Sequence, residues 1–282
     1  MKIINSNKEN YDIILVAGQS NAESCGKGAP IIPWTPQENI HMLKNEFVPE
    51  FLKDENGFFY VKIDAEKDAH IEIAQERKGE TPDKDCGVFA LQFAERYAKN
   101  YLKAGRKVLI VHTAVGATGF ARKDWGVGDV IYNRMMDMAD SALNMGGDNK
   151  FVAFLWHQGE HDADFPAPNF NYDENYAKYK KNVFAVFSAV REKFGKDLPI
   201  IAGDFCYEWA SQLLTKCQSV SNATIDVLKE MGNSGFVQTK DLKSNNQVLG
   251  DGDIIHFCRA SLEILGERYF NEFKKIKDII KQ

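Results

Sequence analysis

The chain has 282 residues, a net charge of −5, 44% hydrophobic residues and 27% charged residues. This composition is ordinary for a water-soluble globular protein, and the scattered basic residues exclude the basic kind of nucleic-acid-binding protein. Because no apolar run approaches the roughly 20 residues that cross a bilayer, we expect no membrane partner, and the oligomeric state stays open.

Apolar runs and helical segments alternate along the chain. Residues 12–17 form a nearly continuous apolar run, which is typical of a strand buried on both faces. Further strands are predicted at residues 108–113, 151–156, 198–204 and 235–239. Helices are predicted at residues 88–102, 130–143, 172–194, 211–231 and 260–280, with Gly195 ending the third. The alternation predicts an α/β fold with a central parallel sheet that is covered by helices on both faces.

Residues 39–85 are the irregular part of the chain. They occupy the place of a second strand and its crossover, and they contain an alternating piece at residues 58–63 beside Asn56-Gly57, a hairpin-turn signal. A loop of this length is usually functional or mobile, so it is either a wall of a substrate cleft or a solvated insertion. With no linker or repeat elsewhere, we expect one domain over residues 1–282.

The two ends of the chain and its five cysteines indicate where in the cell the protein is expected. The first ten residues lack the apolar segment of a signal peptide, and the cysteines form no CxxC pair or metal cluster. We expect a cytoplasmic protein with free thiols, and the alternative is a secreted protein whose signal peptide was removed. The amphipathic C-terminal segment is expected to dock as a terminal helix, with a membrane or partner helix as the alternative.

Small polar residues follow the first strand as Gly18-Gln19-Ser20-Asn21. They suit a tight strand-to-helix turn at the carboxyl end of a strand, where open α/β sheets keep their chemistry. Ser20 is therefore a candidate nucleophile, and the alternative is that it only caps a helix. After the second strand, Gly116 and Gly119 do not form a GxGxxG nucleotide motif. Gly116 offers either a backbone N–H to an anion or simply a tight turn.

The third strand runs into His157-Gln158-Gly159-Glu160-His161. Read literally, this is the H-x-x-E-H pattern of zinc hydrolases, which requires a helix that places both imidazoles on one face. Because a strand leads into it and Gly159 interrupts it, a zinc site formed by His157, Glu160 and His161 is kept only as an alternative. The other interpretations are that Gln158 offers its amide to a developing oxyanion, or that the residues form a satisfied polar cluster.

Near the C-terminus, Asp253 stands three residues before His256. On a turn, this separation lets the carboxylate hold one ring nitrogen and leaves the other for a nucleophile. D-x-x-H is common on surface loops, and Asp251 is a rival carboxylate whose spacing to His256 suits local pairing less well.

These pieces together resemble the SGNH hydrolases, in their sialate O-acetylesterase and acetylxylan esterase branch (carbohydrate esterase family six). The resemblance spans roughly residues 13–270 and rests on GQSN, the glycine-containing turn, WHQGE and DxxHF. It implies a flavodoxin-like three-layer α/β/α sandwich and an esterase that needs no cofactor and removes acetyl groups from xylan-type oligosaccharides or sialic acids. It also implies a triad of Ser20, His256 and Asp253. The implied oxyanion hole is formed by the Ser20 N–H, the Gly116 N–H and the Gln158 side chain.

Other contacts with substrate are predicted from residues near these motifs. Weaker contacts are expected from Gln19, Asn21, Glu160 and Trp125. Further candidates for stacking on a sugar are Phe120, Phe165, Tyr207 and Trp209, although such aromatic residues more often belong to the core. Arg122 or Lys123 is a candidate partner for a sialic acid carboxylate. Glu23, Cys25, Ala117 and His161 depart from the pattern expected near the site, which leaves the substrate open more than the reaction. A non-catalytic glycan-binding module is a further alternative.

Overall fold

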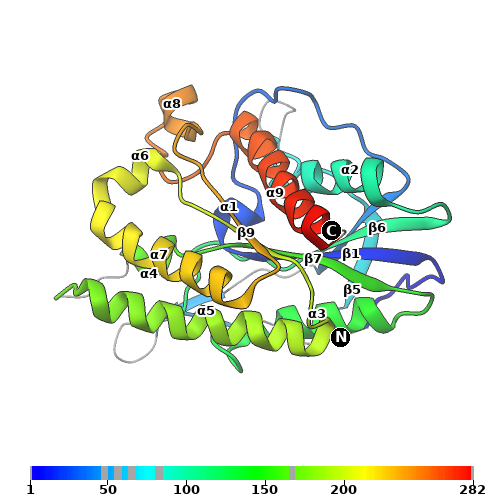
Figure 1. Cartoon of the computed structure of the whole chain (residues 1–282). Coiled ribbons are helices and arrows are strands. Elements are labelled where there is room, and N and C mark those ends of the chain that lie inside the picture. Colours follow the sequence, from blue (N-terminus) through cyan, green and yellow to red (C-terminus); the bar gives the residue numbers. More distant parts are fainter. Residues whose placement is uncertain are drawn as a thin grey trace.

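The computed structural model describes residues 2–45, 50–53, 59–62, 68–79, 85–164 and 169–280. Its centre is a seven-stranded sheet in the order β5-β2-β6-β1-β7-β8-β9 (Figure 1). The strands are β1 (Asn10–Gly18), β2 (Ile40–Asn45), β5 (Ala69–Ile73), β6 (Arg106–His112), β7 (Lys150–His157), β8 (Ile200–Gly203) and β9 (Ser234–Val237). The five predicted strands are confirmed within a few residues. Strands β6-β1-β7-β8-β9 have the flavodoxin-like order, which confirms the predicted fold.

Helices cover both faces of this sheet, as the alternating pattern predicts. In β1, Ile13 and Leu15 face one apolar cluster and Ile14 and Val16 face the other. Because both faces are buried, the strand reads as a continuous apolar run rather than as an alternating one. The long helices are α2 (Phe89–Tyr101), α3 (Val130–Asn144), α5 (Tyr172–Phe194), α7 (Leu214–Met231) and α9 (Arg259–Ile280). Helices α3, α5 and α7 contribute to the first cluster, and α2 and α9 contribute to the second (Figure 1).

The predicted helix boundaries agree with the structure to within one residue, except at the start of α7. Residues 211–213 form the short 3-10 helix η2 (Ser211–Leu213), so α7 begins three residues later than expected. Gly195 ends α5 with a φ of 141°, and its N–H donates to the Arg191 carbonyl. The C-terminal helix α9 docks as predicted, because Leu265, Tyr269 and Phe273 are fully buried against the sheet and α2. No helix in the described part of the chain is both long enough and apolar enough to cross a bilayer.

The region of residues 39–85 contains strands that the sequence pattern did not separate. Strand β2 pairs in parallel with β6, whereas β5 pairs antiparallel with β2 at the edge. The predicted parallel sheet thus has one antiparallel edge strand, β5, which makes the whole sheet mixed. A separate two-stranded sheet pairs β3 (Glu50–Lys53) with β4 (Phe59–Lys62). Strand β4 lies within the predicted alternating piece at residues 58–63. The predicted turn Asn56-Gly57 lies outside the described residues.

Short helices α1 (Ser20–Glu23), α4 (Glu160–Asp164), α6 (Tyr207–Ala210) and α8 (Asn245–Leu249) complete the fold. Helix α1 follows the end of β1 after one residue, and α4 follows the end of β7 after two. The chain leaving β1 runs toward β2 on one side of the sheet, whereas the chain leaving the neighbouring β7 runs toward β8 on the other, so the two connections diverge between these strands. This edge of the sheet brings the polar motifs together.

Candidate active site

The turn after β1 places Ser20 at the beginning of α1. Gly18 has a φ of 138°, and a Cβ on it would lie 2.0 Å from the His157 carbonyl oxygen. Only glycine fits both the conformation and the close approach of β7. The chain then turns sharply, so that Gln19 is the N-cap and Ser20 the first helical residue.

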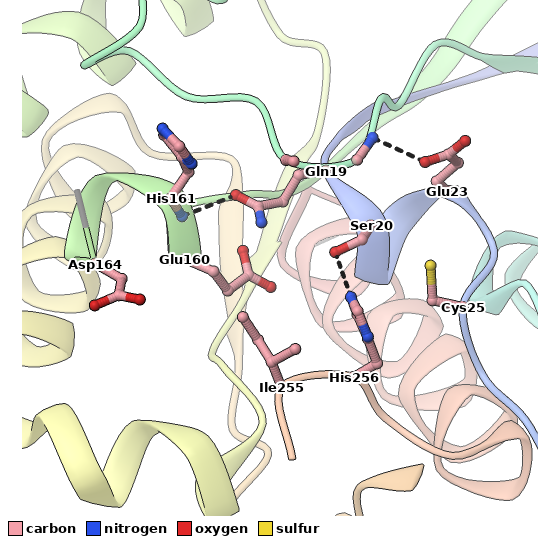
Figure 2. A pocket seen from close by; sticks show the side chains of 11 residues that line it. Gln19, Ser20, Glu23, Cys25, Glu160, His161, Asp164, Ile255 and His256 are labelled. Carbon is pink, nitrogen blue, oxygen red and sulfur yellow. Dashed lines mark hydrogen bonds between the residues drawn. The ribbon is translucent and has the colours of Figure 1, made fainter. Parts of the chain in front are cut away.

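Ser20, His256 and Asp253 form a continuous hydrogen-bonded chain (Figure 2 shows Ser20 and His256). Ser20 Oγ lies 2.8 Å from His256 Nε2, and His256 Nδ1 lies 2.8 Å from Asp253 Oδ1. Since an ionised carboxylate only accepts hydrogen bonds, His256 Nδ1 carries the proton and Nε2 accepts the one from Ser20. The structure therefore brings together the three residues of the predicted triad.

Asp253 is held by donors from two other segments. Its Oδ2 accepts from Asn245 Nδ2 at 2.9 Å and from Lys27 Nζ at 3.2 Å. Partial burial opposes its charge, but the interactions with Asn245, His256 and Lys27 hold its pKa below the usual value. The rival Asp251 pairs with Lys27 at 3.0 Å and accepts the Asp253 N–H. Asp253 is therefore the carboxylate that orients the imidazole.

A cavity of about 600 Å³ opens onto this chain of hydrogen bonds. It is lined by Gln19, Ser20, Glu23, Cys25, Gly116, Ala117, Glu160, His161, Asp164, Ile255 and His256 (Figure 2). The predicted contact residues Gln19 and Glu160 are among them, whereas Asn21, Gln158 and Trp125 are not. Such a cavity is large enough for a small ligand.

Asn21 connects the nucleophile turn to the other motifs instead of lining the cavity. Its amide nitrogen donates to Glu160 Oε1 at 2.8 Å and to the Ile255 carbonyl at 3.1 Å, and its Oδ1 accepts the Phe257 N–H at 3.0 Å. These bonds hold the segment that carries His256 against α1. The structure thus makes Asn21 a positioning residue, which corrects the expectation of a direct substrate contact.

Glu160 is a buried carboxyl group at the edge of the cavity. It is 1% exposed, and burial raises its pKa to about 7 against the opposing hydrogen bond from Asn21. Its Oε2 has no hydrogen-bond partner among the described residues. Asp162, two residues further on, is also buried, and its pKa is raised to about 6 by burial.

Glu160→Gln is expected to remove a pH dependence of the free energy of unfolding. Because the folded pKa of Glu160 is raised, the folded protein binds more protons than the unfolded chain from about pH 4.5 to about pH 7. In this window the wild type loses stability as the pH rises, by on the order of 3 kcal/mol from Glu160.

Denaturant unfolding at about pH 5 and about pH 8 measures this loss in the wild type and the variant. The exposed Glu192 provides the control Glu192→Gln, which should keep the wild-type difference between the two pH values. The same difference in Glu160→Gln as in the wild type would contradict the assignment to Glu160.

The predicted oxyanion donors do not all face the cavity as free groups. The Gly116 N–H donates to Glu23 Oε2 at 2.8 Å. Gln158 is 3% exposed, and its amide nitrogen has three acceptors: Asp162 Oδ2 at 2.7 Å, the Thr118 carbonyl at 3.2 Å and Gln19 Oε1 at 3.3 Å. Two amide hydrogens are fully used by these acceptors. The predicted role of Gln158 as an oxyanion donor therefore disagrees with its hydrogen bonds.

Most of the predicted sugar-stacking residues belong to the core. Trp125 is fully buried, donates to Thr118 Oγ1 at 2.8 Å and packs edge-on against Trp156, so it is not a substrate contact. Phe120 and Trp209 are 7% and 6% exposed. Tyr207 is 40% exposed and carries Lys240 over its ring, but it does not line the cavity. Phe165 lies outside the described residues.

The two predicted partners for a sialic acid carboxylate are also absent from the cavity lining. The Arg122 side chain is 6% exposed, lies 3.3 Å from Asp124 Oδ2 and donates to the Ala117 carbonyl. Lys123 is exposed on the turn that follows. Arg122 therefore stabilises the loop after β6 instead of facing the cavity.

The side chains of the alternative zinc site do not converge. His157 ends β7 and is fully buried, with Nδ1 3.0 Å from the Tyr269 hydroxyl and Nε2 4.0 Å from Glu160 Oε1. His161 lies on α4 and points away from Glu160 (Figure 2). Within the described residues, no three His, Cys, Asp or Glu side chains are grouped so as to hold a metal ion. The strand that leads into the motif separates the two imidazoles.

Several residues of the candidate site have only weak signals in the sequence. Glu23 follows Ser20 by three residues, so it lies one turn along α1 and reaches Gly116. Asp164 and Ile255 line the cavity because they neighbour Glu160 and His256 in the chain. Asn245 and Lys27 hold Asp253 from distant segments, and no sequence pattern connects them to it.

The chain matches a known protein family by sequence. The sequence profile of the family "Carbohydrate esterase, sialic acid-specific acetylesterase" matches residues 10–275. A search of curated proteins found no match.

Solved structures share the fold at low sequence identity. NanS superposes with a TM-score of 0.70 at 16% identity, covering 96% of this chain and 99% of NanS. A protein from Arabidopsis thaliana gives a TM-score of 0.65 at 17% identity, with 95% and 98% covered. A carbohydrate acetylesterase from Xanthomonas citri gives 0.61 at 15% identity, with 94% of this chain and 56% of that one covered. These likenesses establish the common fold.

Proposed function

Because the chain belongs to the carbohydrate esterase family of the sialic acid-specific acetylesterases, we propose that it removes O-acetyl groups from sugars through Ser20, His256 and Asp253. The observation that carries this proposal is the Asp253–His256–Ser20 chain, with both hydrogen bonds at 2.8 Å, at the wall of the cavity. A hydroxyl bonded to an imidazole that a carboxylate orients is the arrangement of an activated serine nucleophile.

The proposed reaction has two steps. His256 Nε2 takes the Ser20 proton while Ser20 Oγ forms a bond to the acetyl carbon, and the carbonyl electron pair moves onto its oxygen. When that pair returns, the bond to the sugar oxygen breaks, and His256 gives its proton to the leaving hydroxyl. Water then attacks the acetyl-Ser20 ester by the same sequence and releases acetate, and Asp253 stabilises the imidazolium in both steps.

The charges of the cavity favour a neutral acetylated sugar as the substrate. Glu23, Glu160 and Asp164 contribute carboxyl groups to its wall, and none of the described lining residues is Lys or Arg. The carboxylate of a sialic acid would meet the Glu23 and Asp164 carboxylates there, whereas Glu160, whose pKa is raised to about 7, adds charge only toward alkaline pH. A xylan-type oligosaccharide carries no charge and meets no such repulsion. We therefore place acetylated xylan-type sugars ahead of acetylated sialic acids for this chain.

The test is acetate release from acetylated xylo-oligosaccharides, acetylated sialosides and 4-nitrophenyl acetate, with and without EDTA. The proposal predicts hydrolysis that EDTA does not change, and a higher kcat/KM on the xylo-oligosaccharides than on the sialosides. Loss of all activity in EDTA would favour a zinc hydrolase instead. Glycan binding with no acetate release from any substrate would favour a non-catalytic binding module.

A further inference from the structure

Glu23 is a carboxylate of the cavity wall that the triad does not use. It follows Ser20 by three residues on α1, and residues with this separation are neighbours on the surface of a helix. A Cβ built on Gly116 would lie 2.9 Å from Glu23 Oε2 and 3.6 Å from Ser20 Cβ. Because glycine carries no side chain, the carboxylate and the nucleophile are both left open to one ligand.

One oxygen of Glu23 is anchored and the other is not. Oε2 accepts the Gly116 N–H at 2.8 Å, and the buried guanidinium of Arg134 attracts the carboxylate. Oε1 makes no hydrogen bond with any residue in the described part of the chain. A carboxylate that is held by one oxygen presents the other as an acceptor, and its position is determined before a substrate arrives.

An acceptor this close to Ser20 meets the part of the substrate that lies next to the ester. A carboxylate oxygen only accepts hydrogen bonds, so the matching group on the substrate must be a donor. In a sugar acetate, the nearest donors to the ester are the hydroxyl groups on the neighbouring ring carbons. A sugar in which these hydroxyls are also acetylated offers no donor at this position.

We propose that Glu23 Oε1 accepts a hydrogen bond from a sugar hydroxyl next to the acetylated one, so that Glu23 selects partly acetylated sugars. This proposal rests on the proposed serine mechanism and names the substrate feature that the same cavity recognises. A substrate without that hydroxyl leaves a desolvated carboxylate oxygen without a partner, and its reaction is slower for that reason. Glu23 is then a specificity-determining residue.

Two matched esters test the proposal. One is a monoacetylated xyloside with free hydroxyls on both carbons next to the ester, and the other is its deoxy counterpart, in which hydrogen atoms replace those hydroxyls. We expect the wild-type kcat/KM to be about 10- to 100-fold higher on the hydroxylated ester. Glu23→Ala should reduce this ratio to within about threefold of unity. If the variant only loosened the loop after β6, both values would fall together and the ratio would stay as in the wild type.

Two further variants separate the hydrogen bond from the charge and from the loop contact. Glu23→Gln keeps an oxygen that accepts the Gly116 N–H, and its NH₂ group can still hydrogen-bond the sugar hydroxyl without a charge. Its ratio should therefore lie between those of the wild type and Glu23→Ala. Asp164→Asn is the matched control, because Asp164 also lines the cavity but lies on the far side from Glu23 (Figure 2). It removes the same charge and should keep the wild-type ratio.

The outcomes distinguish this proposal from the serine mechanism. A ratio near unity in the wild type, or the wild-type ratio in Glu23→Ala, would overturn the role of Glu23. If Ser20→Ala is inactive in the same assay, either of those results leaves the serine mechanism intact. An active Ser20→Ala, or no hydrolysis of either ester by the wild type, would overturn the proposed function and the role of Glu23 with it.

Discussion

Replacing Ser20 with Ala is expected to lower kcat on 4-nitrophenyl acetate by about 10⁶-fold, to the rate left by binding and the oxyanion donors alone. The loss is this large because His256 then has no hydroxyl to deprotonate, and the three groups act as a unit. Among the described residues, the Ser20 hydroxyl bonds only to His256, so the variant should fold like the wild type. The measurement is steady-state hydrolysis with the melting temperature recorded alongside.

Ser24→Ala is the matched control for Ser20→Ala. Ser24 is buried at the other end of α1, and its hydroxyl donates to the Cys86 carbonyl at 3.1 Å, outside the cavity. It should lose about 1 kcal/mol of stability and keep its kcat. Comparable activity in Ser20→Ala and Ser24→Ala would remove Ser20 from the mechanism.

Asp253→Asn is expected to lower kcat by about 10⁴-fold with little change in fold. In the wild type, Asp253 Oδ2 faces two donors, Asn245 Nδ2 and Lys27 Nζ. An asparagine would turn its oxygen toward these donors and its NH₂ toward His256 Nδ1. That nitrogen must then accept, so the proton of the imidazole moves to Nε2, which no longer takes the proton of Ser20.

Asp251→Asn is the control for this prediction, because Asp251 also pairs with Lys27 but does not touch the imidazole. It should change kcat by less than about threefold. The pH profile of kcat/KM gives a second check, since Asp253→Asn should regain some activity at high pH, where hydroxide takes the Ser20 proton in place of His256. Equal losses in the two variants would show that the charge near Lys27 matters rather than the orientation of His256.

The strands were predictable from the sequence where both faces of the sheet are covered by helices. Strand β1 is apolar throughout because both of its faces are covered, and the same holds for the middle of β6 and β7. The edge was less predictable: β5 pairs antiparallel with β2, and its strand AHIEI alternates between buried and less buried residues. Its pairing depends on a partner that the local pattern does not specify.

The hydrogen-bonded arrangement of Ser20, His256 and Asp253 was predictable, because the spacing of these residues is local or typical of the family. Asp253 and His256 are three residues apart, and Ser20 follows a strand end that a glycine must occupy. The sequence did not predict which of Gln19 and Gln158 lines the cavity, since both residues follow strands and both carry an amide. Which one faces the cavity depends on Asp162 and Tyr179, which capture Gln158 from α4 and α5. Trp125 near the motifs likewise proved to be core, because Trp156 and Thr118 bury it.

Phosphonylation of Ser20 tests the central claim. The wild type is treated with a 4-nitrophenyl alkylphosphonate, the modified residue is located by peptide mass spectrometry, and the remaining esterase activity is followed with the extent of labelling. We expect a single phosphonyl group on Ser20 and activity that falls in proportion to it, with His256→Ala unlabelled. Full activity in protein labelled on Ser20, or inactivation with Ser20 unmodified, would contradict the proposed mechanism.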